Sequence, residues 1–250
     1  MKSAAIAAAT LFLISSILSA GDLTITSKTT GRVAGTSTTY MTANAMRSND
    51  QLARFDIVTD FKNGVTYHIN HKDKTISFTK VADVASLVEA MNANQPKGKG
   101  MAEFNAGMND LYGDPSTFKV ENAGKDTVIG RSCNKTRITS GKLVWEYCVD
   151  PTLRSPIDPA SMLKMTNASY AGLAGHPKMA KVMSNLMEAT SKLNGVALRT
   201  RMSGYAGDVL TEVTSINQSP IPASAFALPA GYTMKDQIAE TKKQLAAHHH

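Results

Sequence analysis

The chain has 250 residues, of which 42% are hydrophobic, and a formal net charge of +7 at pH 7. A chain of this length can bury a full core without disulfide or metal staples, and a single domain of this size is ordinary for an all-β or α+β fold. Its Lys and Arg residues are scattered, and Trp145 with seven Tyr and seven Phe offers few rings for base stacking, so a nucleic-acid-binding protein is not expected.

Residues 1–20 have the pattern of a secretory signal peptide. Lys2 precedes an uncharged apolar run over residues 4–18, and small residues follow at the expected cleavage site. The apolar run is short for a membrane span, which needs about twenty residues. We expect cleavage before Gly21 or Asp22 and export to the bacterial periplasm or beyond the cell, which lowers the net charge from +7 by one, to +6. An uncleaved helix that tethers the protein to the inner membrane is the alternative.

Asp22 stands where a bacterial lipoprotein would carry the cysteine that is lipidated, so no lipid anchor is expected. Residues 21–247 are predicted to form one domain. Residues 248–250 are three His and resemble the remnant of a purification tag, so they are excluded from metal reasoning.

The stretch over residues 22–80 alternates with period two, the pattern of strands that are buried on one face. Its clearest part has an expected buried face of Phe55, Ile57, Thr59 and Phe61 and an expected solvent face of Asp56 and Asp60. Because no long helix interrupts the stretch, an antiparallel meander is expected instead of a parallel βαβ unit.

The apolar spacing then becomes helical. Helices are predicted over residues 81–93, 101–111, 158–172 and 177–193. The third has Asp158 as its N-cap and Pro159 in its first turn. Strands return over residues 196–203 and 209–216, and a polar helical tail ends the chain.

Two cysteines, Cys133 and Cys148, lie in strand-like runs on either side of Ser140 and Gly141. If these two residues form a two-residue hairpin loop, the cysteines face each other directly, at a separation that a disulfide can bridge. Export would favour oxidation. A free thiol pair or a metal site is the alternative, but the chain offers neither CxxC spacing nor a nearby histidine.

These features resemble the bacterial domain of unknown function 4412 family and, more distantly, the LolA-like superfamily of periplasmic lipoprotein carriers. The resemblance is carried by residues 55–78, by the cysteine hairpin, by residues 195–199 and 212–216, and by the endings Ile221-Pro222-Ala223-Ser224-Ala225-Phe226 and Leu228-Pro229-Ala230-Gly231-Tyr232. It implies an α+β fold in which an incomplete, unclosed antiparallel β-barrel has a few helices plugging its concave face. In the carriers that cavity holds acyl chains, and Arg47 and Arg54 are candidates for the arginine that locks the lid.

The fourth predicted helix repeats methionine every four residues at Met179, Met183 and Met187. Deformable thioethers suit the lining of an apolar cavity. The expected lining is Met162, Met165, Met179, Val182, Met183, Leu186, Met187, Trp145 and Tyr147. A Cu(I) site that includes His176 is the alternative, but no metal or cofactor is predicted.

No GxSxG, HExxH, P-loop or CxxCH motif occurs, so an enzyme is not expected. The Asp56 and Asp60 pair fits a solvated strand face better than an acid–base site. His68 and His71 should point to opposite sides of their strand, so a shared metal is not expected.

Together these features predict a soluble periplasmic binding or carrier protein, which holds a lipid or acyl chain between the curved sheet and the Met-rich helices. The alternative is an envelope protein-interaction module, whose barrel is filled by its own side chains and whose edge binds a protein partner.

Overall fold

The structure is a computed structural model that describes residues 21–247, apart from residues 33, 51–54, 94–98, 171–175 and 205–206. The predicted signal peptide and tag remnant lie outside the described residues, as does Arg54. Their assignments therefore stay predictions.

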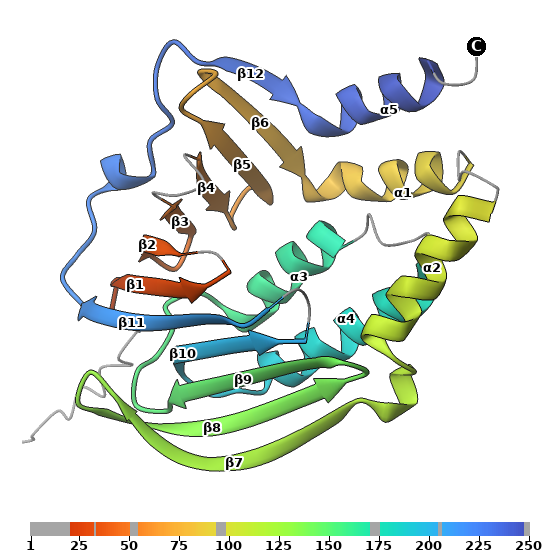
Figure 1. Ribbon diagram of the computed structural model, residues 1–250. Coiled ribbons are helices and arrows are strands. Elements are labelled where there is room, and N and C mark those ends of the chain that lie inside the picture. The colour runs from red at the N-terminus through yellow and green to blue at the C-terminus, as the bar shows by residue number, and fades with distance from the viewer. Residues whose placement is uncertain are drawn as a thin grey trace, which may run out of the picture.

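Twelve strands form one curved sheet in the order β12-β6-β5-β4-β3-β2-β1-β11-β10-β9-β8-β7 (Figure 1). The strands are β1 (Leu23–Gly31), β2 (Gly35–Met41), β3 (Ala45–Asp50), β4 (Phe55–Asp60), β5 (Val65–Asn70), β6 (Thr75–Lys80), β7 (Lys119–Val128), β8 (Arg131–Ser140), β9 (Leu143–Asp150), β10 (Val196–Ser203), β11 (Val209–Asn217) and β12 (Thr233–Asp236). All neighbours pair antiparallel except β12 and β6, which pair parallel. The terminal strands β12 and β7 are not paired with each other, so the barrel stays open, which confirms the predicted fold class.

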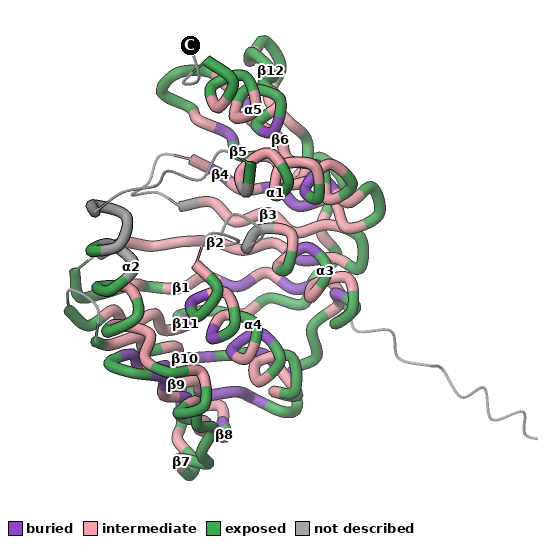
Figure 2. The backbone as a smooth tube through the Cα atoms, turned by 90° about the vertical axis from the view of Figure 1, so that its right-hand side faces the viewer, coloured by how far each residue is buried: buried purple, intermediate pink, exposed green. Residues whose placement is uncertain are grey.

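Within the described residues, five α-helices accompany the sheet: α1 (Val84–Ala93), α2 (Lys99–Tyr112), α3 (Pro159–Tyr170), α4 (Pro177–Ser191) and α5 (Gln237–Ala247). Short 3-10 turns, η1 (Val81–Asp83), η2 (Pro115–Thr117) and η4 (Ala223–Phe226), join them to strands. Helices α3 and α4 lie in the concavity of the sheet, while α1 packs against α5 near the end of the sheet that β6 and β12 form (Figures 1 and 2). All the predicted helices are present, whereas β12 was not predicted because it is short, polar and mostly exposed.

The centre of the concave face is a packed core and not an empty space. Val182 and Leu186 of α4 are 0% and 7% exposed and pack against Trp145 of β9, which is 6% exposed. Burial of this kind contributes about 1.5–3 kcal/mol for each large apolar side chain. Helix α4 is therefore fixed to β8 and β9 along its apolar stripe.

The opposite face of β4–β6 is also covered, which corrects the expectation for this stretch. Asp56 and Val58 share that face by strand alternation, and they are only 8% and 4% exposed. The cover is the segment after β11, whose Leu228 and Tyr232 pack against the cluster around Val58. Asp56 is therefore not a solvated carboxylate, because a segment distant in sequence lies over it.

Cys133 and Cys148 form a disulfide with Cα atoms 5.2 Å apart, which confirms the predicted bridge. The predicted hairpin register was wrong, however. The loop is Gly141 and Lys142, so Cys148 faces Lys135 and the bridge runs diagonally. The shift moves each partner by two positions, which leaves both cysteines on the same face of the hairpin.

The end of α2 explains the position of this loop. The Lys142 amide donates to the Leu111 carbonyl at 2.9 Å, and a Cβ on Gly141 would lie 2.4 Å from the Gly113 nitrogen. Gly141 also has a φ of +54°, in the region that favours glycine. The chain therefore turns one residue later than predicted, where its glycine can pack against the backbone of the α2 end.

Removing the disulfide should lower the free energy of unfolding by about 3 kcal/mol, because the bridge closes a loop of this size in the unfolded chain. The change is the double substitution Cys133→Ser and Cys148→Ser, measured by urea unfolding against the oxidised wild type. Reduction of the wild type should give the same loss. Equal unfolding midpoints for the oxidised wild type and the double variant would contradict the prediction.

Candidate functional site

Five of the nine residues predicted to line a cavity come together in one packed cluster. They are Trp145, Tyr147, Val182, Met183 and Leu186, and their partners include Ile138 and Leu143. Met165 and Met179 are also buried, at 7% and 6% exposure. These side chains hold α4 on the sheet, and the open space lies on either side of that helix.

The first opening, here called the α3–α4 groove, runs between the two helices of the concavity and has a volume of about 310 Å³. It includes two of the predicted lining residues, Met162 and Met187. Its lining is Ser155, Ile157, Pro159, Met162, Leu163, Thr166, Met187, Thr190, Ser191, Leu193 and Gly195. Sequence periodicity alone could not find this groove, because half of its wall comes from the loop before α3 and from the end of α4.

Hydroxyl groups in this groove donate to the backbone of their own helices. Thr166 Oγ1 donates to the Met162 carbonyl at 2.8 Å, and Thr190 Oγ1 donates to the Leu186 carbonyl at 2.9 Å. Ser191 Oγ donates to the Glu188 carbonyl at 2.9 Å. Of the four hydroxyl groups that line the groove, these three already donate their protons within the helices, and the fourth belongs to Ser155. The wall is therefore more apolar than its composition suggests.

Asp150 holds the loop that supplies one wall of this groove. Its side chain is 2% exposed, accepts from Arg131 Nε at 2.5 Å, and accepts from the Thr152 amide and hydroxyl at 2.8 and 2.6 Å. Burial alone would raise the pKa of Asp150, but the hydrogen bonds from Thr152 and Arg131 more than offset it, so the pKa lies below its ordinary value. Asp150 is therefore ionised at neutral pH and fixes the start of the loop.

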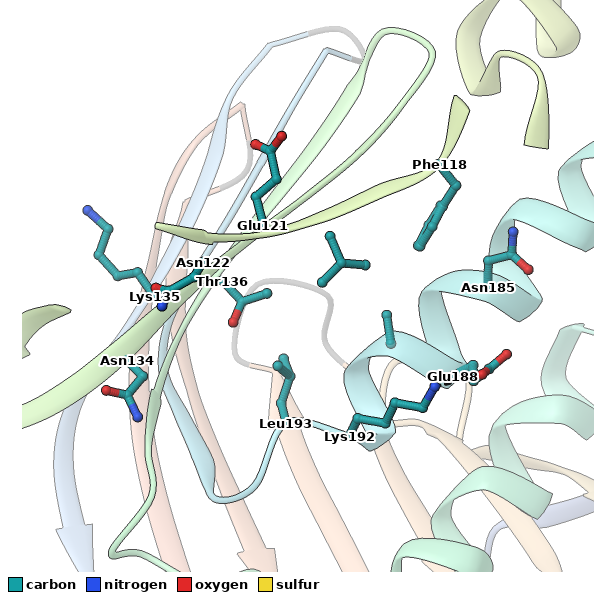
Figure 3. A pocket seen from close by; sticks show the side chains of 12 residues that line it. Phe118, Glu121, Asn122, Asn134, Lys135, Thr136, Asn185, Glu188, Lys192 and Leu193 are labelled. Atoms are coloured by element: carbon teal, nitrogen blue, oxygen red, sulfur yellow. Dashed lines mark hydrogen bonds and ion pairs between the residues drawn. The ribbon is translucent and has the colours of Figure 1, made fainter. Parts of the chain in front are cut away.

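The second opening, here called the α4–β7 groove, has a volume of about 710 Å³ (Figure 3). Phe118 and Thr136 contribute from the strand side, while Asn185 and Glu188 contribute from α4. The full lining is Phe118, Val120, Glu121, Asn122, Asn134, Lys135, Thr136, Asn185, Glu188, Ala189, Lys192 and Leu193. Leu193, just beyond the end of α4, is part of the lining of both grooves.

The thioethers considered for copper lie in different surroundings. Met183 packs in the Trp145 cluster, whereas Met187 lines the α3–α4 groove. Among the described residues, no three His, Cys, Asp or Glu side chains gather closely enough to hold a metal ion.

Asp56 belongs to an ion-pair network that holds the C-terminal segment. Its Oδ2 is 2.5 Å from Arg47 Nη2 and 3.1 Å from His71 Nε2. Arg47 Nη1 also donates to the carbonyls of Ala225 and Ala227, at 3.1 and 3.2 Å. Asp60 instead binds Asn63 in the following turn, so the two carboxylates do not form a site.

Arg47 does not lock a helix over the concavity, as the resemblance to the carriers implied. It lies on the face of β3 opposite to Met46, which packs with the concave-side cluster that includes Met162. His71 extends the same network, with its Nδ1 3.1 Å from the Tyr232 hydroxyl. By strand alternation His68 lies on the other face of β5 from Ile69, which packs in the Val58 cluster, so the two histidines do not share a partner there.

Replacing Arg47 by leucine should cost about 3 kcal/mol of unfolding free energy, because it leaves the buried Asp56 carboxylate without its main counter-ion. Urea unfolding measures the loss. The double variant Arg47→Leu and Asp56→Leu should recover at least about 1 kcal/mol relative to the sum of the single changes. Strict additivity of the two substitutions would show that the pair is not coupled.

A family model described as Domain of unknown function (DUF4412) matches residues 20–232. No curated protein matches the chain. Among solved structures, an uncharacterized conserved protein from Thermus thermophilus is 8% identical, with 87% of this chain and 91% of that chain covered and a TM-score of 0.48. MucB in the MucA/MucB complex of Pseudomonas aeruginosa is 12% identical, with 85% and 57% covered and a TM-score of 0.42.

The Mycobacterium tuberculosis lipoprotein LppX is 9% identical, with 81% of this chain and 88% of that chain covered and a TM-score of 0.32. The family match extends from the residue before Gly21 to Tyr232, and so includes the whole sheet apart from β12. The chain therefore belongs to the DUF4412 family, as its C-terminal motifs predicted.

Proposed function

We propose that the mature chain is an exported binding or carrier protein that holds one alkyl chain of a lipid in the α3–α4 groove. The observation that carries this proposal is the apolar wall of that groove, formed by Ile157, Met162, Leu163, Met187 and Leu193. A ligand without hydrogen-bonding groups gives up no hydrogen bonds to water when it packs against such a wall. A polar ligand would lose its hydrogen bonds to water and find no replacements there.

The size of the groove supports a single chain. Ligand pockets in proteins range from about 300 to 1,000 Å³, and the groove is at the lower end of this range. Met162 and Met187 can adjust their rotamers to chains of different length, since methionine is unbranched and flexible.

Export supports a carrier role outside the cytoplasm. The predicted signal peptide provides the route, and the oxidised Cys133–Cys148 bridge suits an oxidising compartment. None of the helices that the structure describes combines the length and the apolar character that crossing a bilayer requires.

The second candidate function is the protein-interaction module predicted from the sequence. It is favoured by a different feature, the unpaired edge of β7, and does not need the α3–α4 groove.

Primary alcohols of increasing length should displace a fluorescent fatty acid from the purified protein with rising affinity. Each added methylene contributes up to about 0.8 kcal/mol while it is buried, so the gain should continue from octanol to dodecanol and stop once the groove is full. Fluorescence titration gives the affinities. Affinity that does not depend on chain length would contradict the proposal.

A matched pair of variants locates the ligand. Ser191→Trp adds bulk inside the groove and should weaken dodecanol binding at least about ten-fold, a change of about 1.4 kcal/mol. Ser184→Trp makes the same change at an exposed position of α4 that does not line the groove, and should bind normally. Equal binding by the two variants would place the alcohol elsewhere.

A further inference from the structure

The last strand of the sheet has an open edge. β7 pairs with β8 on one side, and in the part of the chain that the structure describes no strand pairs with its other side. Every second residue of such an edge directs its backbone N–H and C=O outward, where they can form a ladder with an added strand.

The two halves of this edge differ. Beyond Asn122 a β-bulge places Ala123 and Gly124 opposite the single residue Lys135, and Gly124 has a φ of +88°. The Gly124 amide donates to Asn122 Oδ1 at 2.9 Å, which closes the bulge locally. A bulge is one of the usual means of blocking strand addition. The first half, from Lys119 to Asn122, has no bulge and pairs regularly with residues 136–139.

The half of β7 without the bulge borders the α4–β7 groove. Val120 is 51% exposed, and both Val120 and Glu121 line this groove. Phe118, just before β7, and Ala189 of α4 line the groove as well. A strand added to the edge would therefore place alternate side chains over an apolar surface that is already exposed.

The polar rim of the groove offers hydrogen-bonding partners to a peptide backbone. Glu188 and Lys192 form an ion pair at 2.8 Å, so they neutralise each other. The remaining rim includes the charged side chains of Glu121 and Lys135 and the amide side chains of Asn122, Asn134 and Asn185. The amides can both donate and accept hydrogen bonds, and a peptide backbone offers matching groups.

From this juxtaposition we infer that the first half of β7 binds an extended segment of a partner protein by strand addition, with uncharged apolar side chains at alternate positions in the α4–β7 groove. Such binding goes beyond the proposed lipid function and uses a separate groove. Main-chain hydrogen bonds supply affinity in this mode, and the groove supplies specificity.

The probe is a fluorescein-labelled peptide of seven residues, blocked at both ends, in which Phe alternates with Thr. Fluorescence anisotropy with the full mature chain should show saturable binding. Val120→Lys and Asn185→Trp should each weaken binding at least about ten-fold, because they place a charge or a large ring in the groove. Met234→Lys, at an exposed apolar residue of the opposite edge strand β12, is the matched control and should bind normally.

Two further peptides test the backbone ladder. They carry N-methyl groups at odd or at even positions, and one should bind at least about ten-fold more weakly than the other, because only every second N–H faces β7. Ser191→Trp should leave peptide binding unchanged, which separates strand addition from the lipid proposal. No binding up to the solubility limit of the peptide, equal binding by the two methylated peptides, or displacement of the labelled peptide by dodecanol would overturn the inference.

Discussion

The apolar concave face of an open sheet must be covered by other parts of the chain, and this constraint determines where the helices and the grooves beside them lie. Twelve strands curve without closing, so the apolar side chains inside the curve need a second layer. Helix α4 supplies it, with Val182 and Leu186 packed on Trp145. This contact is closely packed, and the two grooves described above lie on either flank of the helix.

The two flanks differ in chemistry because they have different second walls. On the α3 side the walls come from the two helices and the loop before α3. Thr166 and Thr190 donate their hydroxyl protons to helix carbonyls, which leaves an apolar surface. On the β7 side the wall is an edge strand with free backbone groups and an amide-rich rim. One helix therefore separates a site suited to an alkyl chain from a site suited to a peptide, and Leu193 is their common boundary.

The sequence was sufficient for the local elements and for the α+β open-barrel class. Apolar spacing found most of the strands, the helices and the side chains that attach α4 to the sheet. It did not find the burial of Asp56, because that depends on Arg47 meeting carbonyls of residues 225 and 227, 178 and 180 positions away. Periodicity marked the Met stripe as a buried face, but it does not say whether side chains or a ligand fill the space against it.

Methionine methyl NMR tests the central claim, that an alkyl chain binds between α3 and α4, most directly. With ¹³C-methyl methionine in the mature chain and dodecanol as ligand, the methyl signals of Met162 and Met187 should shift, and the exposed Met234 should not. The substitutions Met162→Leu and Met187→Leu assign the two signals. Unchanged Met162 and Met187 signals, or shifts confined to Met183 in the packed cluster, would contradict the account.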